Sequence, residues 1–304
     1  MNIETPEVSF ELLNQSFCDK VFNGQIKEAM ENSSLYIRKK LYEDGILRRL
    51  FESRTVTSDE LDPEIGTDNP SILCEIEPDA PRATYVPFKG TGDRSYFNGK
   101  RFRIPFGKVE SDRESKSKFE LMTIRMPITD WLKEHQVKSI QEEEDQQFID
   151  TIADIIAQNA AAQSVTVNMS TNTFKDAFVE GWKMITRLRL PQGKVLMHKN
   201  TYLDSLKLKT DDIGFKPQED RFNRGVDGED SFMGSPVVTT IKDNLVKENE
   251  LYFFTQPEYF IKFFFLQDAT LFLKAEADMI HFYTYEAPGV GIGNTNGVVK
   301  VTLA

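Results

Sequence analysis

The chain has 304 residues and a mass of 34.9 kDa, enough to bury a sizeable core in one large domain or two smaller ones. Its net charge of −11 argues against a protein that holds nucleic acid across a basic face, and its mean hydropathy of −0.43 argues against a membrane protein. The first residues lack a secretory signal, and the only cysteines, Cys18 and Cys74, are too widely spaced for a disulfide framework or a thiolate metal site. We therefore expect a protein that is made and stays in a cytoplasm, with no cofactor and no membrane contact.

The first part of the chain predicts a helical arm within residues 9–53. Such an arm needs a surface to cover its apolar side, which is either its own core or a neighbouring copy of the chain. Apolar residues recur at three- and four-residue steps in two groups, and Asp44–Gly45 is a predicted break within the second group. The first group is Phe10, Leu13, Phe17, Val21 and Phe22, and the second is Tyr36, Ile37, Leu41, Ile46, Leu47, Leu50 and Phe51.

Residues 55–118 predict a connecting loop followed by a β-hairpin. Residues 55–79 are acidic and rich in turn residues, which indicates a loop. Alternating residues flank Asn98–Gly99, a pair that favours a tight hairpin turn, so we predict two strands within 83–106. The second strand places Phe102, Ile104 and Phe106 on one face and Arg101 and Arg103 on the other.

Basic residues are concentrated in this region. Residues 82–118 contain ten basic and four acidic residues, a local charge of +6 that leaves −17 for the rest of the chain. Because a basic hairpin on an acidic body complements that body, its expected partner is another copy of the chain.

The next segment predicts a strand over Phe119–Ile128 and then one long helix. Ser139 with Glu142 three residues later has the capping-box spacing, which predicts a helix over 139–160, about 33 Å long. Four consecutive carboxylates, Glu142, Glu143, Glu144 and Asp145, lie in its first turns. Its apolar stripe consists of Ile140, Phe148, Ile149, Ile152, Ile156 and Ala160.

The last part of the chain predicts an α+β region. Thr173 or Asn172 could cap a helix that begins near Phe174, and 211–234 is a long polar loop. Eight of the 23 Phe residues lie between Phe253 and Phe282, which favours strands covered on both faces by helices. Other predicted elements are strands at 194–197, 236–241, 251–254, 259–266, 270–274, 277–285 and 298–303, and a short helix at 201–208.

No group of residues predicts catalysis or metal binding. Gly289–Gly293 resembles part of a dinucleotide fingerprint, but a strand is predicted after it where a helix is needed, so we interpret it as a flexible β–β connection. His135, His198 and His281 lie in unrelated segments without a second ligand at helical or strand spacing. The carboxylates of Glu142–Asp145 point around the helix, which favours a solvated or ion-paired face over a cation site. We expect no enzyme activity.

The order of parts resembles the major capsid proteins of tailed bacteriophages, whose α+β fold is named after phage Hong Kong 97. That fold has an N-terminal arm, an extended β-hairpin loop, a peripheral domain with a long spine helix, and an axial domain, and the chain returns to the peripheral domain near its end. The C-terminal part of the sequence is similar in its residue pattern to C-termini in this family. The segments that carry this similarity are Gly234–Val238, Glu250–Phe253 and Glu286–Asn294, followed by Val298–Val301. In the order of the chain, the resemblance assigns 1–54 to the arm, 55–118 to the connecting segment and extended loop, 119–164 to the peripheral strand and spine helix, 165–266 to the axial domain and 267–304 to the returning strands.

The resemblance implies a structural protein of the virion that self-assembles as a homo-oligomer. It implies hexamers and pentamers that form an icosahedral shell around double-stranded DNA, assembled in the host cytoplasm. A separate scaffold, a portal and decoration proteins are implied as possible partners, and packaged DNA as a weak, non-specific one. The alternative with the same fold is an encapsulin-like shell around cargo enzymes, and a third hypothesis is a soluble enzyme with a lid-like hairpin.

Charge complementarity predicts the contact between neighbouring subunits. We expect Lys100, Arg101, Phe102 and Arg103 of the extended loop to face an acidic surface of the adjacent subunit. The candidate surface on the spine helix consists of Glu142, Glu143, Glu144 and Asp145.

Overall fold

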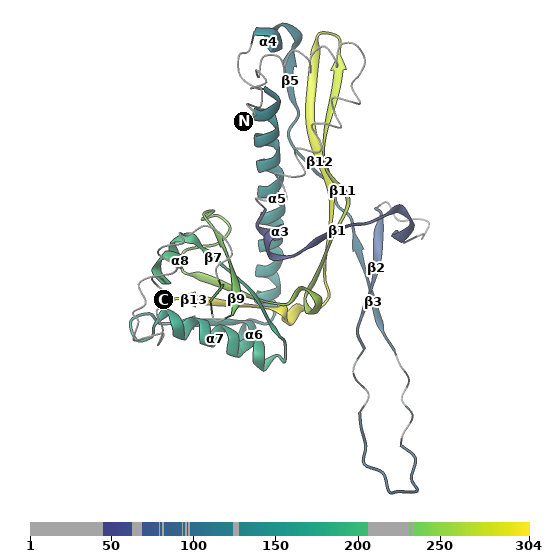
Figure 1. Cartoon of the computed structure of the whole chain (residues 1–304), viewed down its shortest axis with the longest axis vertical. Coiled ribbons are helices and arrows are strands. Elements are labelled where there is room, and N and C mark those ends of the chain that lie inside the picture. The colour runs from purple at the N-terminus through teal and green to yellow at the C-terminus, as the bar shows by residue number, and fades with distance from the viewer. Residues whose placement is uncertain are drawn as a thin grey trace, which may run out of the picture.

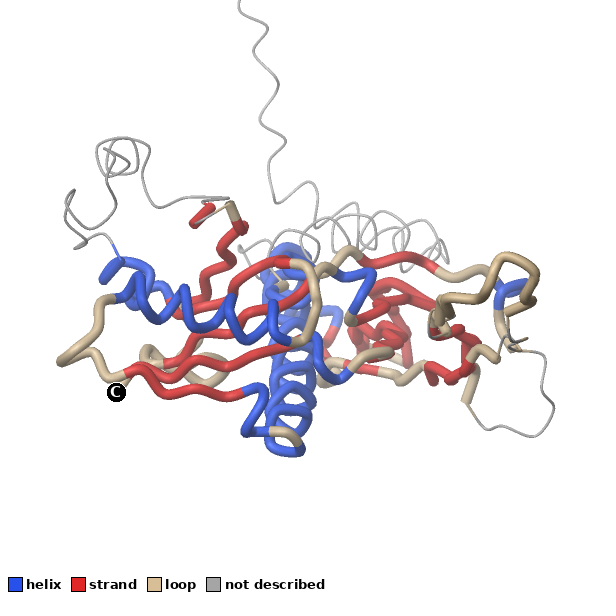
Figure 2. Tube along the Cα trace, turned by 90° about the horizontal axis from the view of Figure 1, so that it is seen from below, coloured by secondary structure: helices blue, strands red, loops and turns tan. Residues whose placement is uncertain are grey.

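A single long helix, α5, forms the centre of the molecule. The computed structural model describes residues 45–62, 69–78, 80, 82–92, 94, 96, 98–123, 128–205, 231–232 and 234–304. The helix spans Ile128–Gln158, 31 residues or about 46 Å. Figure 1 shows α5 upright beside the main sheets, and the end-on view in Figure 2 shows strands on both sides of it.

Helix α5 begins earlier than the capping-box signature predicts. Ser139 is an exposed residue inside the helix, so the predicted start at Ser139 is wrong. The physical reason is that Leu132 and Val137, each 1% exposed, continue the apolar stripe towards the N-terminus and pack on the core. The predicted stripe is confirmed for Ile140, Phe148, Ile149, Ile152 and Ile156, which are all buried. Its last member, Ala160, is exposed and lies beyond the end of α5 at Gln158.

The strand predicted at Phe119–Ile128 is also wrong at its beginning, where helix α4 spans Lys118–Thr123. Residues 124–127 lie outside the described residues. The backbone N–H of Glu120 donates to Ser117 Oγ and that of Ser117 donates to Glu120 Oε2, both at 3.2 Å. This reciprocal pair is a capping box, and it favours a helix start at this point.

A short helix, α3 (Ile46–Leu50), precedes the first strand. It is the end of the predicted second helix of the arm, and residues 1–44, which hold the rest of that prediction, lie outside the described part of the chain. Asp145 of α5 accepts hydrogen bonds from the backbone N–H groups of Leu47 at 3.0 Å and Ile46 at 3.4 Å. A carboxylate at the N-terminus of a helix satisfies donors that have no partner within the helix.

The first sheet is built on one long hairpin, β11 (Ile261–Glu276) and β12 (Met279–Ile292), paired from Ile261↔Ile292 to Glu276↔Met279. The strands predicted at 259–266 and 270–274 are therefore one strand with irregular register near Gln267. Gln136 of α5 fixes one face of the hairpin, since Thr284 Oγ1 donates to its Oε1 at 2.6 Å. The other strands of this sheet are β1 (Ser53–Thr55), which runs parallel to β11, and β4 (Val109–Glu110) and β5 (Glu114–Ser117), which both pair with β12.

The second sheet has six strands in the order β6-β13-β10-β7-β9-β8. Helix α7 (Phe174–Arg187) covers one of its faces, and the predicted Thr173 cap is confirmed by a capping box with Asp176. The strands are β6 (Ser164–Val167), β7 (Gln192–His198), β8 (Ser231–Phe232), β9 (Ser235–Thr240), β10 (Glu250–Thr255) and β13 (Val298–Leu303), and the small helices beside them are α6 (Ala160–Gln163) and α8 (Lys199–Ser205).

Helices cover both faces of this second sheet, as the density of Phe residues predicted. On the α7 side, the Phe253 ring contacts Phe178 and Trp182 edge-on, with centroids 5.3 and 5.1 Å away. On the opposite side, Phe254 belongs to a cluster with Phe51 and Phe148, which joins the sheet to α5 and to the segment after α3. The predicted loop 211–234 lies largely outside the described residues.

A two-stranded ribbon, β2 (Ser71–Ile76) and β3 (Lys100–Pro105), projects from the body. Its register runs from Ser71↔Pro105 to Ile76↔Lys100. The hairpin predicted around Asn98–Gly99 is therefore wrong: the partner of β3 is β2, within the segment predicted to be a loop. Burial decides this pairing, because Ile72 and Ile104 face one apolar cluster at 8% and 0% exposure.

The end of the chain differs from two expectations. Gly289–Ile292 is part of strand β12, not a flexible connection. Strand β13 pairs with β10 and β6 of the second sheet, so residues 267–304 do not form one unit with the first sheet. The segment Thr295–Gly297 forms a 3-10 turn, as Ser58–Glu60 and Pro257–Tyr259 do. Within the described ranges, no helix is long and apolar enough to cross a membrane.

Candidate functional site

The projecting ribbon is anchored to the body by close packing at its base. Ile104 and Phe106 of the ribbon are 0% and 4% exposed and lie against Phe264. They also lie over Gly289 and Gly291 of β12, where a Cβ atom would come within 2.7 Å of Phe106 and 2.2 Å of Ile104. The absence of side chains at these two positions lets the ribbon approach the sheet.

Beyond its base, the ribbon leads into a long segment, and the described residues between 77 and 99 extend away from the body (Figure 1). Every described residue from 82 to 100 is exposed. Three are aromatic: Tyr85 is 102% exposed, Phe88 107% and Tyr96 91%. Large apolar side chains gathered on one fully exposed segment are typical of an interaction site.

A groove of about 600 Å³ lies where the ribbon leaves the body. Phe102, Phe260 and Phe264 line it, and Tyr259 at its edge is 46% exposed. Burial raises the pKa of the Cys74 thiol, and Lys262 opposes that shift. The charged residues that line the groove are Glu75, Glu77, Glu258, Lys100 and Lys262.

The predicted contact residues of the extended loop lie at the base of the ribbon. Lys100 is exposed at the start of β3, and Phe102 is half-buried in the groove. Arg101 pairs with Glu75 at 2.8 Å, and Arg103 pairs with Asp62 at 2.9 Å. The basic face of β3 is thus exposed as predicted, but its two arginines already have carboxylate partners in the same chain.

The four predicted carboxylates of the spine helix separate into two pairs. Glu142 and Glu143 are exposed. Glu144 and Asp145 are 5% and 1% exposed, which differs from the expectation of a continuous acidic surface. Asp145 holds the start of α3 and accepts from Lys242 Nζ at 3.3 Å. Burial raises its pKa, while the hydrogen bonds from Leu47 and Ile46 and the charge of Lys242 oppose the shift.

A buried charge cluster surrounds Arg48 of α3. Its guanidinium lies 2.9 Å from Glu286, 3.3 Å from Glu144 and 3.5 Å from Asp268, and over the ring of Phe265. Burial, with a hydrogen bond to the neighbouring Glu144 carboxylate, raises the pKa of Glu286 to about 10, and Arg48 opposes this shift. Burial and the neighbouring carboxylate thus favour the neutral form of Glu286, and the cluster joins α3, α5, β11 and β12.

The structure also brings together a group that the sequence did not predict. The loop between β9 and β10 places Asp243 and Glu248 beside His198. His198 Nδ1 accepts the backbone N–H of Asn200 at 3.1 Å, so the ring proton lies on Nε2, which faces Asp243 Oδ1 at 2.7 Å. A protonated Nε2 has no lone pair for a metal. Asp243 thus faces His198 at the end of β7, and Glu248 accepts hydrogen bonds from Asn200 and Thr201 of α8, so these contacts connect the loop to both elements.

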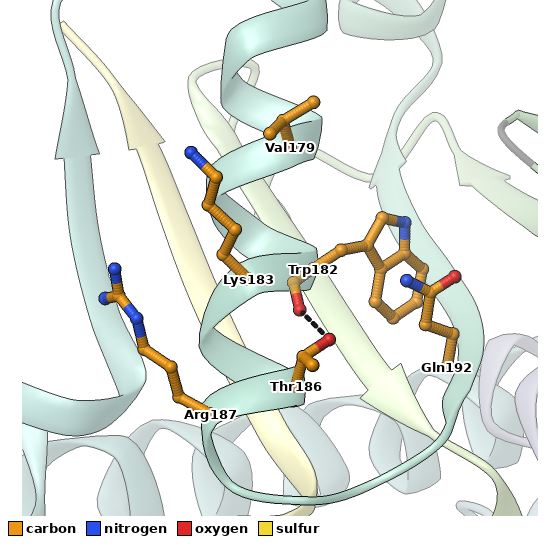
Figure 3. Close-up of a pocket in the computed structure, with 6 residues that line it drawn as sticks. All are labelled: Val179, Trp182, Lys183, Thr186, Arg187 and Gln192. Atoms are coloured by element: carbon orange, nitrogen blue, oxygen red, sulfur yellow. Dashed lines mark hydrogen bonds between the residues drawn. The ribbon is translucent and has the colours of Figure 1, made fainter.

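A shallow hollow of about 430 Å³ lies beside α7 (Figure 3). Trp182 forms part of its wall, and Thr186 Oγ1 donates to the Trp182 carbonyl oxygen at 2.9 Å. Lys183 and Arg187 point away from the indole ring, so charged and aromatic groups do not converge on one ligand position. The residues that line it are Val179, Trp182, Lys183, Thr186, Arg187 and Gln192.

Sequence reasoning missed the groove because its walls come from four separate segments of the chain. Glu77 follows β2, which was predicted to be a loop, and Glu258 and Tyr259 belong to the 3-10 turn before β11. One signal was available: Ser71–Cys74 is a short apolar run within a polar stretch, and such a run is consistent with a strand.

The sequence matches no protein-family model and no curated protein. Solved structures, in contrast, show the class of fold: this chain has the fold of virus capsid and virus-like-particle subunits. Three matches illustrate it. The virus-like particle from Pyrococcus furiosus matches with a TM-score of 0.55 and 14% identity over 90% of this chain and 99% of that one. The structure of Microbacterium phage Oxtober96 matches with a TM-score of 0.60 and 11% identity, over 86% of this chain and 92% of that one. The mature capsid of bacteriophage PhiM1 matches with a TM-score of 0.56 and 10% identity, over 83% of this chain and 85% of that one.

These matches cover most of both chains, so the likeness extends to the whole fold and is not confined to one domain. The mixed helix-and-sheet architecture is that of phage capsid structures, in agreement with the resemblance to major capsid proteins of tailed phages. The encapsulin-like alternative is not favoured by these comparisons.

Proposed function

We propose that this chain is the structural subunit of an icosahedral phage capsid, which self-assembles into hexamers and pentamers that enclose double-stranded DNA. The observation that carries the proposal is the match of most of the fold to capsid structures, for example over 86% of this chain with a TM-score of 0.60. The exposed aromatic segment at 82–96 supports it, because such a segment requires a partner. This role is structural and involves no catalysis.

The proposal includes a division of the chain into the parts of the Hong Kong 97-type fold. In this proposal, residues 1–54 are the arm and 55–118 contain the extended loop. Helix α5 is the spine of a peripheral domain that includes the β11–β12 hairpin, and the six-stranded sheet with α7 is the axial domain. Each subunit then has several weak contacts with its neighbours, and symmetry closes them into a stable particle.

The contact between the extended loop and the neighbouring spine helix remains part of the proposal. Lys100, Arg101, Phe102 and Arg103 contribute from the loop. Glu142 and Glu143 are the exposed carboxylates of the spine that are suited to receive them, whereas the burial of Glu144 and Asp145 assigns those two to the subunit's own core.

The proposed partners are other copies of the chain, with a separate scaffold, a portal and decoration proteins as further components. Assembly takes place in the host cytoplasm, and the finished chain resides in the virion. The net charge of −11 supports only weak, non-specific contact with packaged DNA, since few cations are available to bind phosphates.

Particle size tests this proposal directly. The chain is expressed alone and with candidate scaffold proteins from the same genome, separated by gel filtration and imaged by negative-stain electron microscopy. We expect closed shells, tubes or capsomer rings in the void volume. A monomer of 34.9 kDa under all these conditions contradicts the proposal. Nuclease-protected DNA in particles from infected cells supports a genome container, and protected cargo enzyme supports the encapsulin-like alternative.

A further inference from the structure

We infer that the exposed loop tip, residues 82–96, docks in the groove at the base of the β2–β3 ribbon of an adjacent copy of this chain. The groove is the cavity of about 600 Å³ between the ribbon, the 3-10 turn at Pro257–Tyr259 and strand β11. This inference rests on the proposed function and adds the acceptor surface for the loop tip.

The apolar groups of tip and groove complement each other. The tip presents Tyr85, Phe88 and Tyr96, which have almost their whole side chains in water. The groove offers Phe102, Phe260, Phe264 and the half-exposed Tyr259 as a floor and edge. Aromatic side chains that enter an aromatic-lined pocket are typical anchors of protein interfaces.

The charges are complementary as well. Residues 82–99 contain three basic residues, Arg82, Lys89 and Arg94, and one acidic residue. The groove has three carboxylates and two lysines, and one of the carboxylates, Glu75, already pairs with Arg101. Neither the three basic residues of the tip nor Glu77 and Glu258 of the groove has an ion-pair partner within the described part of the chain. A basic tip therefore meets open carboxylates in the groove.

The direction in which the loop extends indicates that the groove is occupied by the loop tip of an adjacent copy. Figure 1 shows the loop extending away from the base of its own ribbon, so the tip of one chain does not reach its own groove. Tip and groove are different surfaces of the same chain, and their contact is therefore head-to-tail. Repeated head-to-tail contacts form a ring when the rotation between copies closes, and hexamers and pentamers are rings of this kind.

A thiol crosslink tests the docking, because Cys74 lines the groove. In a chain with Cys18→Ser, single variants Tyr85→Cys, Phe88→Cys and Tyr96→Cys are assembled and treated with a short bis-maleimide. Particles are counted by electron microscopy and crosslinks by denaturing gel. We expect a ladder of linked subunits, roughly tenfold stronger than in the control, because docking raises the local thiol concentration towards the millimolar range.

The matched control is Phe119→Cys, a 72% exposed aromatic position on α4, distant from the ribbon in Figure 1. The ladder should vanish when Cys74→Ser is added to each tip variant. Normal shells with no Cys74-dependent ladder from any of the three positions overturn the docking and leave the proposed function intact. If the parent chain gives no shells with any scaffold, the proposed function fails and the docking with it.

Charge exchange provides a second test without cysteines. Glu77→Lys with Glu258→Lys reverses the open carboxylates of the groove and should reduce shell yield severalfold. Adding Lys89→Glu and Arg94→Glu in the tip should restore assembly, since the attraction between tip and groove then has the opposite polarity. Unchanged yield in the first variant, or no recovery in the second, contradicts docking at these residues.

Discussion

At the scale of single residues, the cluster around Arg48 is the most constrained part of the molecule. Its guanidinium and three carboxylates are almost fully removed from water, and four separate elements contribute to it. Three carboxylates around one cation cannot all be ionised in a buried site at low cost, so one of them keeps its proton. Glu286 is that residue, because burial and the Glu144 carboxylate both favour its neutral form.

The raised pKa of Glu286 predicts a dependence of stability on pH. The folded-state pKa of about 10 lies above the ordinary value of 4.5, so between these values the folded chain keeps a proton that the unfolded chain has released. Stability therefore falls as pH rises, by at most about 1.4 kcal/mol per pH unit from this group. Glu286→Gln cannot release a proton, so its free energy of unfolding should decrease less between pH 6 and pH 9.

Urea unfolding of the unassembled subunit at pH 6, 7, 8 and 9 measures this difference. Glu142→Gln, at an exposed position of α5, is the control and should retain the slope of the unaltered chain. If the profiles of Glu286→Gln and the unaltered chain run parallel, Glu286 is ionised in the folded protein and the assignment is wrong.

None of the partners of Arg48 could be predicted from the sequence. Arg48 lies in α3, and its carboxylate partners lie 96, 220 and 238 positions away along the chain. The sequence did predict that Glu144 lies in a helix. Four consecutive carboxylates have the same local pattern, however, whether they face water or a core. Only the packing of α3 on α5 decides that Glu144 and Asp145 turn inward.

At the scale of elements, the sequence was most informative where apolar spacing was regular. The stripe from Ile140 to Ile156 and the helix after Thr173 were predicted, because each has a periodic face. The predicted helix boundaries were wrong where two capping-box patterns occurred close together in the sequence. The Ser139–Glu142 pattern lies inside α5, whereas the equivalent Ser117–Glu120 pattern begins α4. A capping signature therefore locates a helix start only where the apolar stripe also ends.

The glycines of β12 illustrate a second ambiguity. Gly289, Gly291 and Gly293 indicated a flexible connection, but two of them lie in a paired strand and give room to the ribbon. Glycine in a strand is also typical of a close approach by another segment. The sequence alone does not distinguish these cases, because the residues that approach, Ile104 and Phe106, lie far away along the chain.

Gly291→Ala should destabilise the subunit by about 1–3 kcal/mol, because overpacking a filled core forces strained side chains. The new Cβ would lie 2.2 Å from Ile104 Cδ1, and Ile104 is fully buried. Gly293→Ala is the matched control, since its Cβ would meet Phe102 at 3.7 Å, an ordinary contact. Urea unfolding midpoints compare the two variants. Equal midpoints would show that the ribbon base shifts freely and is not tightly anchored.

At the scale of the whole molecule, strands were predictable but their pairing was not. β1 joins β11 in parallel, β13 crosses to the second sheet, and β2 meets β3 across residues 77–99. Such pairings depend on which apolar faces meet in three dimensions, and no local pattern encodes them. The resemblance to a capsid fold supplied the order of parts, which composition and periodicity alone did not determine.

The last prediction separates folding from assembly at the basic face of the ribbon. Arg101→Glu with Arg103→Glu removes the ion pairs to Glu75 and Asp62, in which the arginine side chains are 64% and 47% exposed. Exposed pairs contribute about 0–1 kcal/mol each, so the subunit should remain folded. If these arginines contact an adjacent subunit, shell yield should nevertheless fall severalfold, as measured by sedimentation and electron microscopy.

A charge swap identifies the cause of that fall. Adding Glu75→Arg and Asp62→Arg restores both pairs within the subunit with opposite polarity, while the charge presented by positions 101 and 103 to a neighbour stays reversed. If the contact is between subunits, the fourfold variant should fold with the stability of the unaltered chain and still assemble poorly. Full recovery of shells would show that the arginines act only within their own chain, and would contradict the proposed contact.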